Sequence, residues 1–143
     1  MTRIDFYILQ SGDAQARSRL ACRLAEKAYM LDHHIYLHTS DQQQASEIDT
    51  LLWTFRQGSF IPHQLQGQPH EAECPVIIGY DHQPEQHDQV LINLDHTVPL
   101  FFSRFQRVVE IVSQDETIKQ QARQRFKFYK DRGYDLHTHN LSV

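Results

Sequence analysis

Apolar residues along this chain fall into short continuous runs and into longer stripes spaced three and four residues apart. Short runs bounded by turn residues are typical of buried strands, and stripes with the longer spacing are typical of amphipathic helices. The pattern predicts strands over residues 3–9, 33–39, 75–80, 89–94 and 107–112. It predicts helices over residues 14–31, 41–55 and 115–132, the last of which stops at Gly133.

The order of these elements indicates the fold class. A strand, a helix and a strand in succession make a βαβ unit, which favours parallel pairing. We therefore predict one α/β domain over residues 1–143, a three-layer α/β/α arrangement around a mostly parallel sheet of about five strands. The eight polar residues between 75–80 and 89–94 are too few for a helical crossover, which favours an antiparallel pair and a mixed sheet.

Two segments carry a weaker pattern. Residues 56–74 contain Gly58, Pro62, Gly67 and Pro69 and are expected to form a loose connection. The last ten residues, YDLHTHNLSV, are expected either to pack irregularly or to form a loose tail.

Composition and charge narrow the choice of partners. The chain has 14 Lys and Arg residues against 18 Asp and Glu residues, a formal net charge of −4. This acidity argues against a protein whose whole surface follows a nucleic-acid backbone. No apolar run approaches the ~18 residues of a membrane span, and the N-terminus lacks the pattern of a signal peptide, so the expected location is cytoplasmic.

Motifs of catalytic or cofactor chemistry are missing. The turn after the first predicted strand has one glycine where a dinucleotide fingerprint has three, and there is no phosphate-binding GxxxxGK[ST] motif. The ten histidines show no metal-ligand spacing, and no GxSxG motif is present. We therefore expect no cofactor, no metal site and no enzymatic activity. A nucleotide-dependent enzyme with a degenerate site remains one alternative.

Positive charge is concentrated near the end of the chain. Residues 119–132 hold six basic side chains and a single acidic one, Asp131. On a helical wheel Ile118, Ala122 and Tyr129 mark the core face, and a separate stripe consists of Lys119, Arg123, Lys127 and Lys130. Phe126 lies on the border between the two. Such a stripe fits an acidic peptide with an apolar end, a direct contact with nucleic-acid phosphates, or simple compensation of the helix dipole.

A second unusual segment is LLWTFRQGSFIPH, residues 51–63. Trp53 points away from the inward face of the predicted helix and is followed by Phe60, Ile61 and Pro62 in a loop. An exposed apolar patch of this kind usually marks a protein interface. The alternative is that the loop folds back and covers the indole ring.

These segments together resemble one family. The N-terminal FYIL, the block with Trp53 and SFIPH (residues 59–63), and the run from Lys119 to Tyr129 are similar to the chi subunit of the bacterial DNA polymerase III holoenzyme, along nearly the whole chain. The resemblance implies a non-catalytic accessory subunit with an α/β fold. It also implies two partners: the psi subunit, which links chi to the clamp loader, and the acidic C-terminal tail of single-stranded DNA-binding protein.

The resemblance also implies roles for particular residues. Positions that match the tail-binding site of the family are Val112, Lys119, Arg123, Phe126 and Lys127, and positions that match the psi-binding surface are Trp53, Phe60 and Pro62. Phe126 replaces a tyrosine of the family, so the ring is kept and its hydroxyl is missing. A direct binder of single-stranded nucleic acid is the remaining alternative, since the basic stripe alone does not exclude it.

Overall fold

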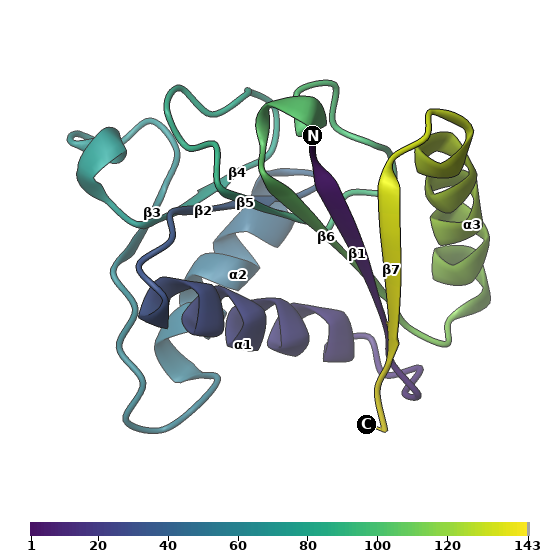
Figure 1. The fold of residues 1–143 in the computed structure, drawn as a ribbon. Coiled ribbons are helices and arrows are strands. Elements are labelled where there is room, and N and C mark those ends of the chain that lie inside the picture. Colours follow the sequence, from purple (N-terminus) through teal and green to yellow (C-terminus); the bar gives the residue numbers. More distant parts are fainter. Residues whose placement is uncertain (143) are drawn as a thin grey trace.

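The fold is an open parallel sheet with helices on both faces. The computed structural model describes residues 1–142, and within them the sheet has seven strands in the order β3-β4-β2-β5-β6-β1-β7, every neighbouring pair being parallel (Figure 1). The strands are β1 (Arg3–Ile8), β2 (Ile35–His38), β3 (His63–Leu65), β4 (Val76–Gly79), β5 (Val90–Asn93), β6 (Arg107–Val112) and β7 (Asp135–Asn140). The α-helices are α1 (Ala16–Met30), α2 (Gln42–Thr54) and α3 (Glu116–Asp131).

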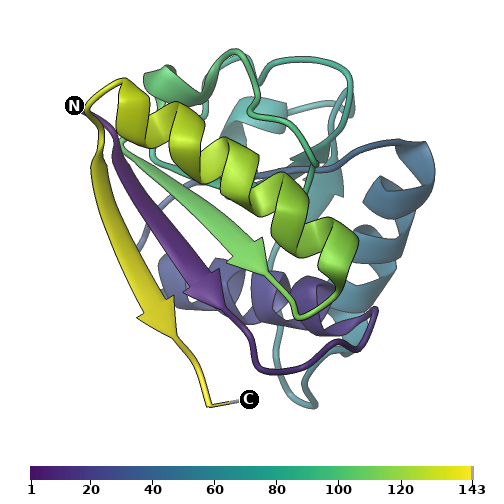
Figure 2. The same ribbon diagram turned by 90° about the vertical axis from the view of Figure 1, so that its right-hand side faces the viewer.

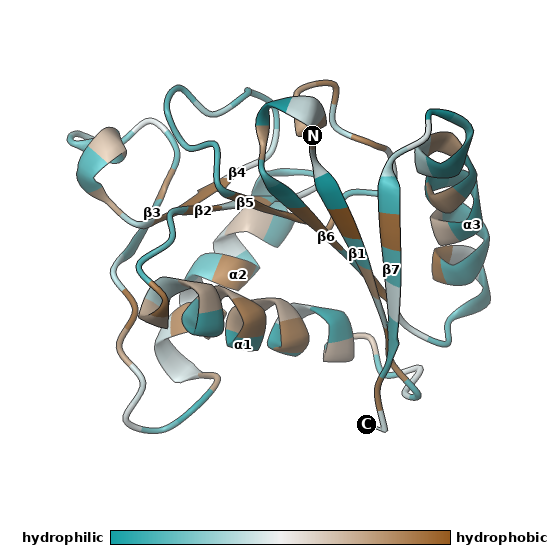
Figure 3. Ribbon diagram, in the orientation of Figure 1, coloured by the Kyte–Doolittle hydropathy of each residue, from teal (hydrophilic) through white to brown (hydrophobic). Residues whose placement is uncertain are grey.

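The sheet divides the core into two halves, which the helices cover. Helices α1 and α2 cover one face of the sheet, and α3 lies across the other face over β6, β1 and β7 (Figures 1 and 2). Successive residues of a strand point to opposite faces. Ile35 and Leu37 of β2 accordingly belong to the half under α1 and α2, while Tyr36 belongs to the half under α3. The central strands are apolar along their length and the outer surfaces of the helices are mixed (Figure 3).

The predicted class is confirmed, and all three predicted helices are present with ends shifted by at most two residues. The helix ends have identifiable causes. The Asp115 carboxylate accepts a hydrogen bond from the backbone N–H of Ile118 at 3.0 Å and caps α3. Gly133, with φ of 78°, takes the left-handed conformation that follows the end of the helix.

The predicted antiparallel pair was wrong. β4 and β5 are not neighbours, because β2 lies between them and is parallel to both. The ten residues 80–89 run from the carboxyl end of β4 back to the amino end of β5 without forming an α-helix. They can do so because each of these strands has only four residues, about 13 Å, and ten extended residues reach up to ~35 Å.

Two strands also lie in segments with little apolar pattern, so within the described residues the sheet has seven strands where about five were predicted. β3 is formed by only three residues of the connection 56–74. β7 is formed by the polar tail segment DLHTHN and pairs with β1 over six residues. β7 is an edge strand whose side chains are partly or fully exposed, so it has no apolar run. Its stability comes from backbone hydrogen bonds to β1 and from the His139 ring, which stacks on Tyr7 at 4.5 Å and bonds the Asp5 carboxylate at 2.8 Å.

A buried ion pair attaches α3 to the sheet. Glu110 of β6 has no exposed surface, and its carboxylate accepts hydrogen bonds from Arg125 Nε at 3.0 Å and from the Tyr129 hydroxyl at 2.8 Å, both on α3. Burial and the nearby Glu110 carboxylate raise the pKa of Tyr129, so the phenol stays the donor. This network fixes the rotation of α3 about its axis, and therefore determines which of its basic residues face solvent.

Candidate functional site

A crevice lies between the first half of α3 and the carboxyl ends of β1 and β6. We call it the α3 crevice; its volume is about 210 Å³ and it is lined by Phe6, Ile8, Val112, Gln114, Lys119, Ala122, Arg123 and Phe126. Phe6 and Ile8 are two residues apart on β1 and therefore share the face that α3 covers. The size is below the range of about 300–1,000 Å³ for drug-sized ligands, and suits one large side chain.

The inner walls of the crevice are apolar. The Phe126 ring packs edge-to-face on Phe6 with centroids 5.2 Å apart, and Val112 and Ala122 are buried beside it. Because Phe126 is held from behind by the core, its remaining exposed surface is a fixed wall rather than a mobile side chain.

The mouth of the crevice carries positive charge. Among the described residues Arg123 forms no ion pair and its side chain is exposed. Lys119 is bound at 3.4 Å to the exposed Glu116 carboxylate, one turn earlier on the helix. An exposed pair of this kind is worth about 0–1 kcal/mol, so another carboxylate can replace Glu116 at little cost.

Lys127 lies one turn beyond the crevice and does not line it. Its Nζ is 2.7 Å from the Asp131 carboxylate, and this hydrogen bond lowers the pKa of Asp131. Of the five residues that the resemblance assigned to tail binding, the structure therefore brings four together and leaves Lys127 at the periphery.

Arg125 does not belong to the exposed basic stripe. The sequence counts it among the six basic residues of 119–132, but its side chain is only 3% exposed and pairs with Glu110. The helical wheel does not place Arg125 in the stripe either, and the buried Glu110 carboxylate on β6 explains why its side chain points into the core. The exposed positive charge of α3 therefore comes from the remaining basic residues.

A second surface is apolar and lies at the C-terminal end of α2. Trp53 is 53% exposed and Phe60 is 67% exposed, with their ring centroids 5.7 Å apart. Pro62 is partly exposed in the same loop. The loop does not cover the indole ring, so the exposed patch expected from residues 51–63 is present. We call Trp53, Phe60 and Pro62 the Trp53 patch.

The loop that presents this patch is held in one conformation by its neighbours. Ile61 is fully buried in the core between Phe60 and Pro62. The ring nitrogens of His63, whose side chain is also buried, lie 2.6 Å from the Ile61 carbonyl oxygen and 3.0 Å from the Asp49 carbonyl oxygen. The His63 ring packs against Trp53 at 4.5 Å. The aromatic rings are thus presented by an ordered loop.

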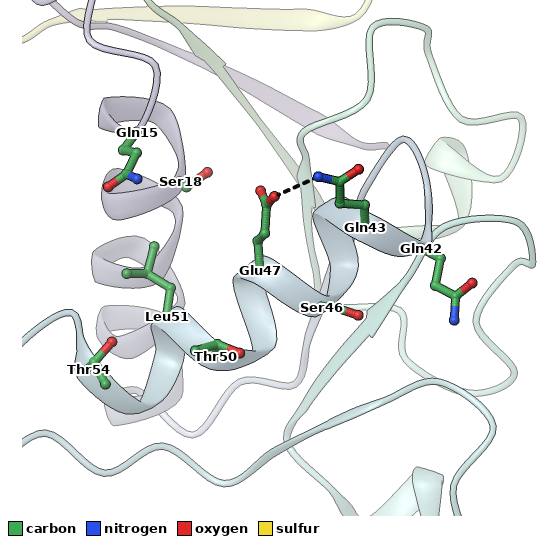
Figure 4. Close-up of a pocket in the computed structure, with 9 residues that line it drawn as sticks. All are labelled: Gln15, Ser18, Gln42, Gln43, Ser46, Glu47, Thr50, Leu51 and Thr54. Carbon is green, nitrogen blue, oxygen red and sulfur yellow. Dashed lines mark hydrogen bonds between the residues drawn. The ribbon is translucent and has the colours of Figure 1, made fainter.

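A hollow on the helical face of the sheet that α1 and α2 cover has a different character. It lies between α1 and α2, has a volume of about 710 Å³, and is lined mainly by glutamine, serine and threonine side chains (Figure 4). Glu47, bonded to Gln43 at 3.4 Å, is the one charged residue among those that line it. Serine and threonine hydroxyls act as nucleophiles when an adjacent base activates them, and no histidine or lysine is among the residues that line this hollow.

Two further findings concern residues 1–142. They contain no cluster of three or more His, Cys, Asp and Glu side chains arranged to hold a metal ion. No α-helix within them combines the length and the apolar character that crossing a membrane requires.

The sequence missed the floor of the α3 crevice. Phe6 and Ile8 lie far from α3 in the chain, and the pairing of β1 with β6 brings them beside it. The strict alternation along β1 places Phe6 and Ile8 on one face and was the available signal, but the sequence does not say which helix covers that face.

Comparison with known proteins gives one consistent family. Residues 1–137 match the family model described as "DNA polymerase III chi subunit, HolC". The chain is 46% identical over 141 residues to DNA polymerase III subunit chi of Pseudomonas aeruginosa, covering 99% of this chain and 98% of that protein. It is 31% identical over 137 residues to DNA polymerase III subunit chi of Haemophilus influenzae, covering 95% of each.

A solved structure extends the likeness of the fold. The crystal structure of T4 UvsW matches with a TM-score of 0.70 at 9% sequence identity, covering 98% of this chain. This chain spans 41% of that protein. At this level of identity the match concerns the fold alone.

Proposed function

Because the chain belongs to the DNA polymerase III chi subunit family, an accessory subunit of replication, we propose that it is non-catalytic and acts by binding two proteins. The α3 crevice would bind the acidic C-terminal tail of single-stranded DNA-binding protein. The Trp53 patch would bind the psi subunit and thereby connect the chain to the clamp loader. A replication subunit acts where the chromosome lies, so we also propose a cytoplasmic location.

The single observation that carries the tail-binding proposal is the α3 crevice itself. It joins an apolar wall, made by Phe6, Val112 and Phe126, to two cations at its mouth, Lys119 and Arg123. A peptide that ends in an aromatic residue and carries acidic residues before it offers the complementary groups: a ring for the wall, and carboxylates for a guanidinium that binds them bidentately.

The energetics favour a weak and salt-sensitive complex. Exposed ion pairs contribute only about 0–1 kcal/mol each, so the apolar anchor must supply most of the affinity. We expect a dissociation constant in the micromolar range, which corresponds to about −8 kcal/mol, and weaker binding as salt screens the exposed charges.

The experiment is a calorimetric titration with a short acidic peptide that ends in phenylalanine. Arg123→Ala should weaken peptide binding about tenfold by removing a bidentate partner at the mouth, and Lys127→Ala should weaken it less because Lys127 lies outside the crevice. Arg23→Ala is the matched control, since Arg23 is an exposed arginine of α1 on the opposite face of the sheet.

Three results would contradict the tail-binding proposal. The first is an unchanged peptide affinity in Arg123→Ala. The second is an equal loss in Arg23→Ala, which would indicate a general effect of net charge. The third is a naked single-stranded oligonucleotide that binds as tightly as the peptide with a steep salt dependence, which would favour direct nucleic-acid binding.

Support for the psi-binding proposal comes from exposure and order together. An exposed tryptophan beside an exposed phenylalanine, held by an ordered loop, is the kind of anchor found at the centre of protein interfaces. Trp53→Ala should greatly reduce copurification with the psi subunit and leave peptide binding unchanged. Full copurification by the variant would refute this assignment.

A further inference from the structure

A further cavity carries positive charge and lies apart from the two surfaces proposed for the protein partners. It lies where α3, α1 and α2 converge at the carboxyl edge of the sheet, and its volume is about 250 Å³. Its polar lining consists of Arg17, Ser40, Gln44, His96, Gln121 and Arg125. We call it the two-arginine pocket. None of its lining residues belongs to the α3 crevice or to the Trp53 patch.

Arg125 contributes a donor with no partner. Its Nε bonds the Glu110 carboxylate and its Nη1 bonds the His96 carbonyl oxygen, each at 3.0 Å. Its Nη2 is buried and has no hydrogen-bond partner among the described residues. The whole side chain is only 3% exposed. Leaving a buried donor of a charged group unsatisfied costs the full desolvation of that group, so native proteins rarely leave one without a partner.

Arg17 contributes charge without a counter-ion. Its guanidinium bonds two backbone carbonyl oxygens, of Ile111 at 3.0 Å and of Leu94 at 3.4 Å, and within residues 1–142 it forms no ion pair with a carboxylate. Burial and the positive charge of Arg125 lower its pKa to about 10, against the opposite effect of Glu110. One buried carboxylate therefore faces two guanidinium groups.

The excess positive charge determines what can complete the pocket. A water molecule would satisfy the free N–H of Arg125 but would leave the charge uncompensated. An oxyanion would satisfy both, because guanidinium groups bind phosphate and carboxylate oxygens with the strongest geometry available to side chains. The hydroxyl of Ser40 and the amide of Gln121 can supply further neutral donors.

The position of the pocket agrees with this reading. Ser40 follows β2, Leu94 follows β5, and Arg17 is bonded to the end of β6. Open parallel sheets bind ligands outside the carboxyl ends of their strands. We propose that the two-arginine pocket is a binding site for a small oxyanion, a phosphate or a carboxylate, that is separate from the surfaces for the two protein partners.

The experiment is a titration of the full chain with sodium phosphate, and separately with sodium acetate, at an ionic strength held constant with sodium chloride. Backbone amide chemical shifts report where binding occurs. We expect saturable shifts at Ser40 and Gln121 with at least one of the two anions. The anion that binds more tightly identifies the chemistry of the ligand as phosphate or carboxylate.

A charge-matched pair of variants tests the location. Gln121→Glu places a carboxylate at the pocket and should weaken anion binding at least tenfold, while raising Tm because the new carboxylate replaces the ligand. Gln120→Glu makes the same change in net charge on the exposed side of α3, outside the pocket, and should change the affinity by less than twofold. Arg17→Gln should also weaken binding at least tenfold, with Arg19→Gln on the exposed side of α1 as its control.

Several outcomes would overturn the proposal. They are the absence of saturable binding of either anion, equal weakening by Gln121→Glu and Gln120→Glu, and shifts confined to Lys119 and Arg123, which would place the anion in the α3 crevice. If Arg17→Gln does not fold, the Gln121→Glu and Gln120→Glu pair decides the question, because Gln120 is exposed, Gln121 is partly exposed, and glutamate has nearly the same shape as glutamine.

Discussion

Replacing Glu110 by glutamine changes one atom of the buried network that attaches α3 to the sheet. In the native protein its Oε1 accepts from Arg125 at 3.0 Å, and its Oε2 accepts from Asn93 Nδ2 at 3.0 Å and from the Tyr129 hydroxyl at 2.8 Å. Glutamine has nearly the same shape, so the substitution removes charge and one acceptor without creating a cavity.

The magnitude follows from counting the groups that lose a partner. If the glutamine oxygen faces Arg125, its amide nitrogen faces Asn93 and Tyr129. The phenol can rotate and accept, but the Asn93 bond is lost, which removes about 1 kcal/mol. The Arg125 guanidinium keeps a hydrogen bond but loses its counter-charge in a site where it is 3% exposed. Breaking a buried pair costs about 3–5 kcal/mol, and because one bond survives we expect about 3 kcal/mol in total.

The assay is equilibrium unfolding in urea followed by circular dichroism. With a slope of about 1–3 kcal/mol per molar urea, a loss of about 3 kcal/mol lowers the midpoint by about 1–3 M. Glu47→Gln is the control, because Glu47 is an exposed glutamate of α2 and should change stability by less than about 0.5 kcal/mol. A loss below about 1 kcal/mol in Glu110→Gln would refute the argument that this network anchors α3.

Three further predictions concern other parts of the molecule. The pKa of Asp5 is lowered to about 2 from an ordinary 3.8, because hydrogen bonds from two arginines and a histidine outweigh the effect of burial. The stability that this carboxylate contributes above pH 4 should therefore fall by about 2 kcal/mol as the pH drops toward 2. Asp5→Asn should flatten this pH dependence in acid-unfolding curves. Gly79→Ala should lower the free energy of unfolding in urea by about 1–3 kcal/mol, because a Cβ at this position would clash with the Tyr36 hydroxyl. That hydroxyl donates a hydrogen bond to the His82 carbonyl oxygen at 2.8 Å. An unchanged free energy of unfolding would contradict this close packing. Trp53→Ala should lower Tm by only a few degrees, about 1 kcal/mol, because the side chain is 53% exposed; a larger fall would mean that any loss of psi binding reflects unfolding.

The sequence predicted more of the helices than of the sheet. The spacing of apolar residues located α1, α2 and α3 within two residues because helical periodicity and capping are local properties. The strands β3 and β7 were not predicted, because β3 is short, β7 is polar, and each forms only through pairing with β4 or β1. The order of the strands escaped as well, since residues 80–89 cross the sheet with no sequence signal that distinguishes a crossover from a hairpin.

For the candidate surfaces the division is similar. The sequence alone determined the composition of the basic segment of α3 and the off-axis position of Trp53, because both depend on neighbours within a few helical turns. Only the tertiary structure identified the partner of the one basic side chain that is buried: Glu110 of β6 pairs with Arg125, and Arg123 remains at the mouth of a crevice. The floor of that crevice is supplied by Phe6 and Ile8, more than 100 residues earlier in the chain. Buried charges must be paired and apolar faces must be covered, and which partner does so is settled by long-range packing that no local pattern encodes.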